Sequence, residues 1–110
     1  MEVRAVAKDI RISTRKVRTV TEMVQGKKVD EALAILKFAP TPAARAVAKV
    51  VKSAAANAAN NSQMEPANLR IVRILADKAR PLKRFRPQPR GRAYSILKRA
   101  SHITVIVDEV

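Results

Sequence analysis

Residues 78–99 read KARPLKRFRPQPRGRAYSILKR, and this stretch contains the part of the chain that cannot pack against the rest. It holds nine basic residues, no acidic residue, and turn-forming residues at 87–91. Runs typical of β-strands flank it, at residues 69–77 and 101–107. The simplest interpretation is one long β-hairpin whose far half is too basic and too poor in large apolar residues to pack against its own protein. We therefore expect an anionic partner to surround that half.

Upstream of the hairpin, the sequence predicts a strand followed by a helix. Residues 2–12 alternate weakly between apolar and polar, which favours a half-buried strand. Ser13 is placed to cap the helix that follows, and Gly26 suits the left-handed residue that ends it. Three valines at helical spacing form its apolar stripe: Val17, Val20 and Val24.

Two more helices are predicted before the hairpin. Asp30 is expected to cap the second helix, which must stop before Pro40 because the residue preceding a proline avoids the helical region. Thr41 caps the third helix, with Pro42 at its first position. The third helix has a small-residue face that allows the sheet to approach closely: Val47, Val50, Val51, Ala54, Ala55 and Ala58.

These elements predict a single α+β domain over residues 1–110, in the order β-α-α-α-β-β. A small three-stranded antiparallel sheet packs on three helices, and a long basic β-hairpin protrudes from it as an arm at about 78–99. At 110 residues the chain is long enough for one modest core.

The charge of the chain points to a polyanionic partner. There are 23 Lys and Arg against nine Asp and Glu, a net charge of +14, which suits nucleic acid or an anionic membrane. The sequence has no Cys and no apolar run long enough to span a membrane, and residues 1–5 lack the apolar core of a signal peptide. We expect a cytoplasmic protein with no membrane partner and no stable homo-oligomer.

The residue types of the arm favour a folded RNA recognised by its backbone and shape. Arginine outnumbers lysine six to three, and only Phe85 and Tyr94 could stack on bases. Cations also crowd the start of the first helix, where the helix dipole disfavours them. Contact with phosphate explains this better than a merely solvated face does. The candidate RNA-binding residues are Arg15, Lys16, Arg18, Lys27, Lys28, Lys78, Arg80, Lys83, Arg84, Phe85, Arg86, Arg90, Arg92, Tyr94, Lys98, Arg99 and His102.

No catalytic or metal site is predicted, and no cofactor. Ser101, His102 and Asp108 are the residue types of a hydrolase, but neighbouring residues on a strand point to opposite faces, so Ser101 and His102 cannot easily meet. One His and no Cys leave no credible transition-metal site. Gly26 and Gly91 do not form a phosphate-binding loop. We predict that the chain is not an enzyme.

Several short motifs, in order and at their spacing, resemble the family of the twenty-second protein of the bacterial large ribosomal subunit. The resemblance covers essentially the whole chain. Its pieces are ISTRKVR at 12–18, GKK at 26–28, SAAANA at 53–58 with Asn60 and Asn61, LKR at 82–84, RGRA at 90–93, and KR at 98–99 followed by SHITV at 101–105.

The resemblance implies a structural constituent of the large subunit that binds its ribosomal RNA and takes part in early subunit assembly. It implies that the hairpin threads among RNA segments and that its tip lines the nascent-polypeptide exit tunnel. Partners would then be large-subunit ribosomal RNA, neighbouring ribosomal proteins and the nascent polypeptide. The tunnel-lining tip would comprise Pro87, Gln88, Pro89, Arg90, Gly91 and Arg92.

Two stretches depart from the family's usual pattern. Residues 78–80 are Lys-Ala-Arg where an acidic residue and a glycine are usual, and residues 87–89 are Pro-Gln-Pro where Pro-Arg-Ala is frequent. These departures affect the detailed geometry expected for the tip. The resemblance also associates residues 82–84, which lie between them, with macrolide sensitivity through the shape of the tunnel.

Two other functions fit parts of the sequence. A DNA-architectural protein could insert a proline-tipped arm, with Pro87 and Pro89, into the minor groove, although such proteins are usually dimers with a large apolar interface. A cationic protein bound at a membrane surface would need broad aromatic and leucine faces on its helices, whereas the best helix here has an Ala/Val face.

Overall fold

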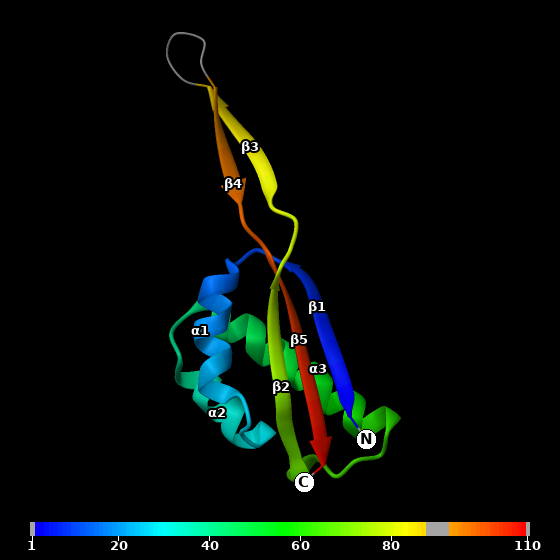
Figure 1. Ribbon diagram of the computed structural model, residues 1–110. Coiled ribbons are helices and arrows are strands. Elements are labelled where there is room, and N and C mark those ends of the chain that lie inside the picture. Colours follow the sequence, from blue (N-terminus) through cyan, green and yellow to red (C-terminus); the bar gives the residue numbers. More distant parts are fainter. Residues whose placement is uncertain (1, 88–92, 110) are drawn as a thin grey trace.

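The computed structural model describes residues 2–87 and 93–109, with only the backbone described between 83 and 97. The predicted α+β class is confirmed: three helices pack on a three-stranded antiparallel sheet, and a two-stranded arm extends from it (Figure 1). The molecule measures 63 × 26 × 16 Å. In chain order the elements are β1 (Val3–Ile10), α1 (Thr14–Val24), α2 (Val29–Phe38), α3 (Pro42–Asn61), the 3-10 turn η1 (Pro66–Asn68), β2 (Leu69–Lys78), β3 (Leu82–Pro87), β4 (Ala93–Lys98) and β5 (Ser101–Glu109).

The C-terminal strand β5 is the centre of the main sheet, whose order is β1-β5-β2. All three helices lie on one face, with α3 behind β1 and β5, and α1 against β2 (Figure 1). Alternate residues of β5 point into this layer, as a period of two requires. The inward set is fully buried: Ser101, Ile103, Val105 and Val107.

Small residues let α3 pack closely on the sheet, as predicted. Val47, Val51, Ala54 and Ala58 have no exposed surface, and they recur at the spacing of one helical face. A side chain as short as alanine keeps the helix axis near the strands, so a core without large aromatics can still be dense.

Local sequence signals correctly predicted the start of α3 and the end of α1. For the start of α1 they predicted the position but not the capping hydrogen bond. Thr41 Oγ1 accepts the Ala44 N–H at 3.2 Å, which confirms the cap of α3. Gly26 has φ +81°, the left-handed conformation predicted after α1. Ser13 does occupy the residue before α1, but its side chain makes no capping hydrogen bond.

The prediction that Asp30 caps α2 is wrong, because α2 begins at Val29 with Lys28 before it. The cause lies in the sheet. Gly26 N–H donates to the Ile71 carbonyl at 3.1 Å, and Ile71 N–H donates to the Lys27 carbonyl at 2.9 Å. This pairing with β2 holds Lys28 extended and starts the helix two residues early. Asp30 then lies in the first turn, where its charge suits the helix dipole.

The long hairpin is interrupted where it leaves the body, as expected from the prolines of its first strand, each of which removes a ladder donor. The ladder between β2 and β5 ends at Lys78 and Ser101, with one more hydrogen bond from Ala79 N–H to the Ala100 carbonyl at 3.0 Å. The arm's own ladder starts at Leu82 and Lys98. Pro81 lies in the gap and has no N–H to donate. The arm is therefore a second sheet, β3-β4, joined to the body by two short linkers.

The face of the main sheet opposite the helices has no covering element in the described chain. Three of its apolar side chains stay partly exposed, namely Val6, Val72 and Leu75. Arg4 and Arg73 lie opposite Ile106 in the ladders, so cations border this apolar strip.

Replacing Ser101 with alanine should destabilise the fold at the point where the arm begins. Ser101 is fully buried, and its Oγ donates to the Ile12 carbonyl at 2.6 Å and lies 3.3 Å from Thr14 Oγ1. Losing this bond should cost about 1–2 kcal/mol, lowering Tm by about 4–8 °C per kcal/mol for a domain of this size. Thermal denaturation followed by circular dichroism measures this. Thr104→Ala, on the other face of β5, is the control, and an equal loss there would contradict the assignment.

Candidate nucleic-acid interface

Cations from distant parts of the chain meet where the arm joins the body, a region that we call the neck. Two grooves lie there, one on each side of the first turn of α1. The neck comprises the residues that line these grooves. Its cations are all exposed: Arg11, Arg15, Lys16, Arg18, Lys78, Lys98 and Arg99.

The first turn of α1 distributes its charges to both grooves. Successive helical residues differ by about 100° in direction, so Arg15 and Arg18 line one groove and Lys16 lines the other. No acidic residue lies in this turn. The positive end of the helix dipole adds to the field of the cations, so an anion is favoured at the neck.

Arg18 also has a role within the fold. Its Nε donates to the Ala76 carbonyl at 3.2 Å, which links α1 to β2. A guanidinium has five N–H donors in a fixed fork, so this bond leaves others for a ligand. Arg18 is thus held in a set direction at the edge of its groove.

Three predicted site residues do not join the neck. Lys27 and Lys28 lie beyond the other end of α1, beside β2, where Lys28 pairs with Arg70. His102 lies on the sheet face opposite Ser101, and its Nδ1 accepts the Asp9 N–H at 3.2 Å. An RNA contact by these three residues stays a prediction.

The remaining predicted residues belong to the arm. Arg80 is exposed in the linker that precedes β3. In the arm's ladder Lys83 pairs with Leu97, Arg84 with Ile96, Phe85 with Ser95, Arg86 with Tyr94, and Pro87 with Ala93. The other tip residues, Gln88, Pro89, Arg90, Gly91 and Arg92, lie outside the described residues.

The chain matches known ribosomal proteins along nearly its whole length. The model of the family Ribosomal protein L22p/L17e matches residues 5–108. The chain belongs to this family. Large ribosomal subunit protein uL22 of Dehalococcoides mccartyi is 60% identical over 107 residues, which cover 97% of this chain and 98% of that protein. The proteins of the same name from Clostridium novyi and Desulforamulus reducens are 53% and 52% identical, and cover 99% of this chain with 98% and 96% of their own lengths.

Membership of the L22p/L17e family makes the chain a structural ribosomal protein of the large subunit. The geometry of β5 agrees with the expectation that Ser101 and His102 cannot act together. Ser101 Oγ is bonded to the Ile12 carbonyl on one face, and His102 Nδ1 accepts an N–H on the other. In the described part of the chain, no helix combines the length and the apolar character needed to cross a bilayer.

Sequence reasoning missed Arg11 and the apolar residues beside it. The alternation over residues 2–12 gives Arg11 only a polar position in the first strand, but β1 ends at Ile10 and Arg11 lines a groove with Lys16 and Lys98. The short sequence distance from Arg11 to the cations of the first helical turn was the signal that it could belong to the same basic surface. Nothing local indicated that Val20 and Leu82, 62 positions apart, would line the same groove.

Proposed function

We propose that this structural ribosomal protein binds large-subunit ribosomal RNA through the neck and the arm, supports early subunit assembly, and lines the nascent-polypeptide exit tunnel with the tip of the arm. The chain is one domain, 1–110, in which the basic stretch 78–99 contains the arm and contributes Lys78, Lys98 and Arg99 to the neck. Its further partners are neighbouring ribosomal proteins and the nascent polypeptide, and it forms no stable homo-oligomer.

One observation carries this proposal: the exposed cations gather at the root of an arm that shares no strand ladder with the body's sheet. A two-stranded ribbon on its own is marginal in water. An arm of this kind is best supported by packing against a partner, and its sequence is strongly basic. Folded RNA supplies both the surface and the negative charge.

The neck and the arm have different tasks in this proposal. The neck anchors the protein, because most of its cations project from the body and contact phosphates that fix position and orientation. In this proposal the arm extends the contact into the subunit through Lys83, Arg84 and Arg86, and Phe85 and Tyr94 are its base-stacking residues. Arg90 and Arg92 then approach the tunnel at the tip.

The salt dependence of RNA binding tests the proposal. If about eight phosphates are neutralised, a plot of log affinity for large-subunit ribosomal RNA against log salt has a slope of roughly −6 to −7. Filter binding or co-sedimentation across a salt series measures it. A slope near zero would contradict the electrostatic mechanism. Equal affinity for duplex DNA would favour the DNA-architectural alternative.

A further inference from the structure

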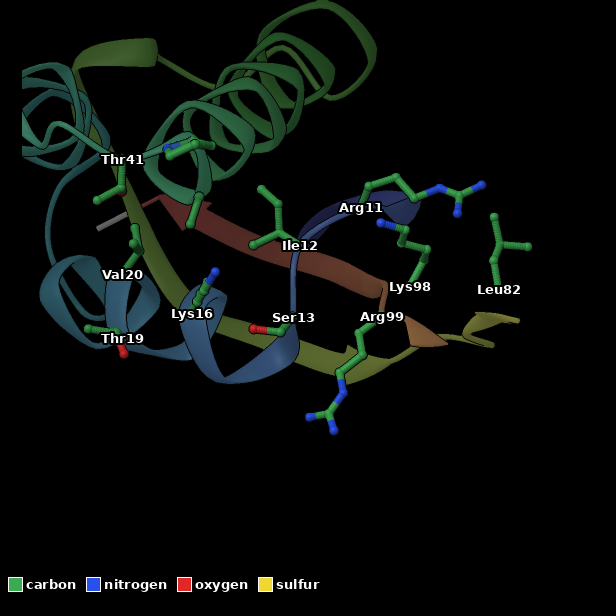
Figure 2. A pocket seen from close by; sticks show the side chains of 12 residues that line it. Arg11, Ile12, Ser13, Lys16, Thr19, Val20, Thr41, Leu82, Lys98 and Arg99 are labelled. Atoms are coloured by element: carbon green, nitrogen blue, oxygen red, sulfur yellow. The ribbon is translucent and has the colours of Figure 1, made fainter. Parts of the chain in front are cut away.

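The groove on the side of the neck nearer α3 differs from the other groove in having an apolar floor (Figure 2). We call it the cleft, and its volume is about 1010 Å³. Val20 and Ala43 are buried and line it, with half-buried Ile12 beside Val20, whereas half-buried Leu82 lines the cleft at the side of the arm, beyond Lys98 (Figure 2). The volume lies just above the range of about 300–1,000 Å³ typical of small-ligand sites.

The rim of the cleft is cationic. Four exposed basic side chains line it, and none of its twelve lining residues is acidic. In Figure 2 the Lys16 ammonium lies between Ile12 and Val20, whereas Arg11, Lys98 and Arg99 stand at the side of the arm. A suitable occupant therefore combines an apolar, planar or compact body with at least one negative charge.

Each of two simpler ligands would match either the charged rim or the apolar floor of the cleft, but not both. An inorganic anion would neutralise the rim but leave the floor in contact with water. An apolar peptide side chain would cover Val20 and Ala43 but leave four cations without counter-charge. A nucleotide has both parts, because its base has apolar faces and its phosphates lie at the distance of one sugar.

We propose that the cleft binds one unpaired nucleotide of the ribosomal RNA, with the base against the floor and its phosphates at the rim. This inference rests on the proposed function of the neck. Bases in a duplex are stacked and inaccessible, whereas those of loops and bulges can be turned outward into a protein pocket. A single inserted nucleotide would fix the register of the protein along an RNA that is otherwise recognised by backbone and shape.

The cleft is held in shape by the fold itself. The Ser101 Oγ bond to the Ile12 carbonyl, at 2.6 Å, fixes the loop that forms one wall. The Thr41 cap on Ala44 N–H fixes the start of α3 at the other wall. Ser13 lines the same space and makes no capping bond to α1, so its hydroxyl can meet the polar edge of a base. A preformed site loses little entropy when the nucleotide enters.

A tryptophan placed in the cleft tests the inference. Thr19 is exposed and lines both grooves, so Thr19→Trp should obstruct the cleft and the edge of the other groove, and Met23→Trp, one turn later on α1 and outside both grooves, is the matched control. We expect Thr19→Trp to lower RNA affinity about five- to tenfold, with the salt slope unchanged because no charge is altered. Dimethyl sulfate and 2′-hydroxyl probing of the bound RNA should show one unpaired nucleotide that gains reactivity with Thr19→Trp only.

The outcomes separate this inference from the proposed function. Thr19→Trp and Met23→Trp could bind RNA equally well and give the same probing pattern, while the salt slope of the unmodified chain has the expected size. This result would overturn the cleft site and leave the neck's role intact. That result is also expected if a protein segment fills the cleft in the subunit. A slope near zero for the unmodified chain would instead contradict the proposed function.

A second measurement does not depend on any variant. Each of the four ribonucleoside 5′-monophosphates is added to the full chain, and the methyl resonances of Val20 and Ala43 are followed by NMR. A base on the floor should move them upfield through its ring current, whereas ribose 5-phosphate, which has no base, should not. Equal shifts with ribose 5-phosphate, or no shift with any of the four nucleotides, would overturn the inference.

Discussion

Replacing Arg15, Lys16 and Arg99 together with glutamine should lower the affinity for large-subunit ribosomal RNA by at least about a hundredfold at moderate salt. Between them these exposed residues line both grooves of the neck. Each lost phosphate contact should also make the salt slope less steep by about 0.7–0.9, so three contacts reduce it by about 2 to 3. Filter binding over a salt series gives both quantities.

A matched variant distinguishes a specific anchor from a loss of net charge. Arg45→Gln, Lys49→Gln and Lys52→Gln remove the same three charges from the exposed surface of α3, away from the neck. The positions in both variants are exposed, so thermal stability should change little. If the α3 variant loses as much affinity as the neck variant, the anchor is diffuse and the neck has no special role.

Removing residues 83–97 and joining Leu82 to Lys98 through Asn-Gly should abolish cross-links between a nascent chain and this protein while leaving the body folded and able to dock. The arm's sheet shares no ladder with β1-β5-β2, so Tm should stay close to that of the full chain. The deletion removes five cations, which reduces the salt slope by about 4. A photo-cross-linker in a stalled nascent polypeptide, with subunit co-sedimentation, measures both effects.

Arg90→Gln with Arg92→Gln is the control for arm length. It keeps the arm's reach and removes two charges at the tip, so nascent-chain cross-links should persist. Complete loss of docking in the deletion variant would show that the arm, and not the neck, is the anchor. Cross-links that persist after the deletion would contradict a tunnel position for the tip.

The features predicted correctly from the sequence depend on interactions within a few residues. Thr41 with Pro42 identifies the start of α3, because a side-chain acceptor and a pre-set backbone angle act within one turn. Gly26 identifies the end of α1 because only glycine takes positive φ without cost. The run from 101 to 107 predicts a strand from its β-branched residues, and this segment forms β5.

The features that were wrong or missed depend on contacts between distant segments. Asp30 is a good cap by type, but the pairing of residues 26–28 with β2 started α2 at Val29. The separation of the arm's sheet from the main sheet, at residues 79–81 and 99–100, is a second case, because the prolines of the hairpin's first strand predict an interrupted ladder but not two separate sheets. The cleft is a further case, since Val20, Ala43 and Leu82 belong to three different elements.

By itself, the sequence determined the class of the fold, the family, and the concentration of positive charge around residues 78–99. Composition and short-range periodicity depend only on neighbouring residues, so they can be read without a structure. Only the tertiary structure decided which cations meet. The first turn of α1, the loop at Arg11, and the end of β4 with Arg99 converge because Ser101 ties that loop to the central strand. The basic stretch 78–99 is consequently two surfaces, an arm with its own sheet and a neck with a cleft.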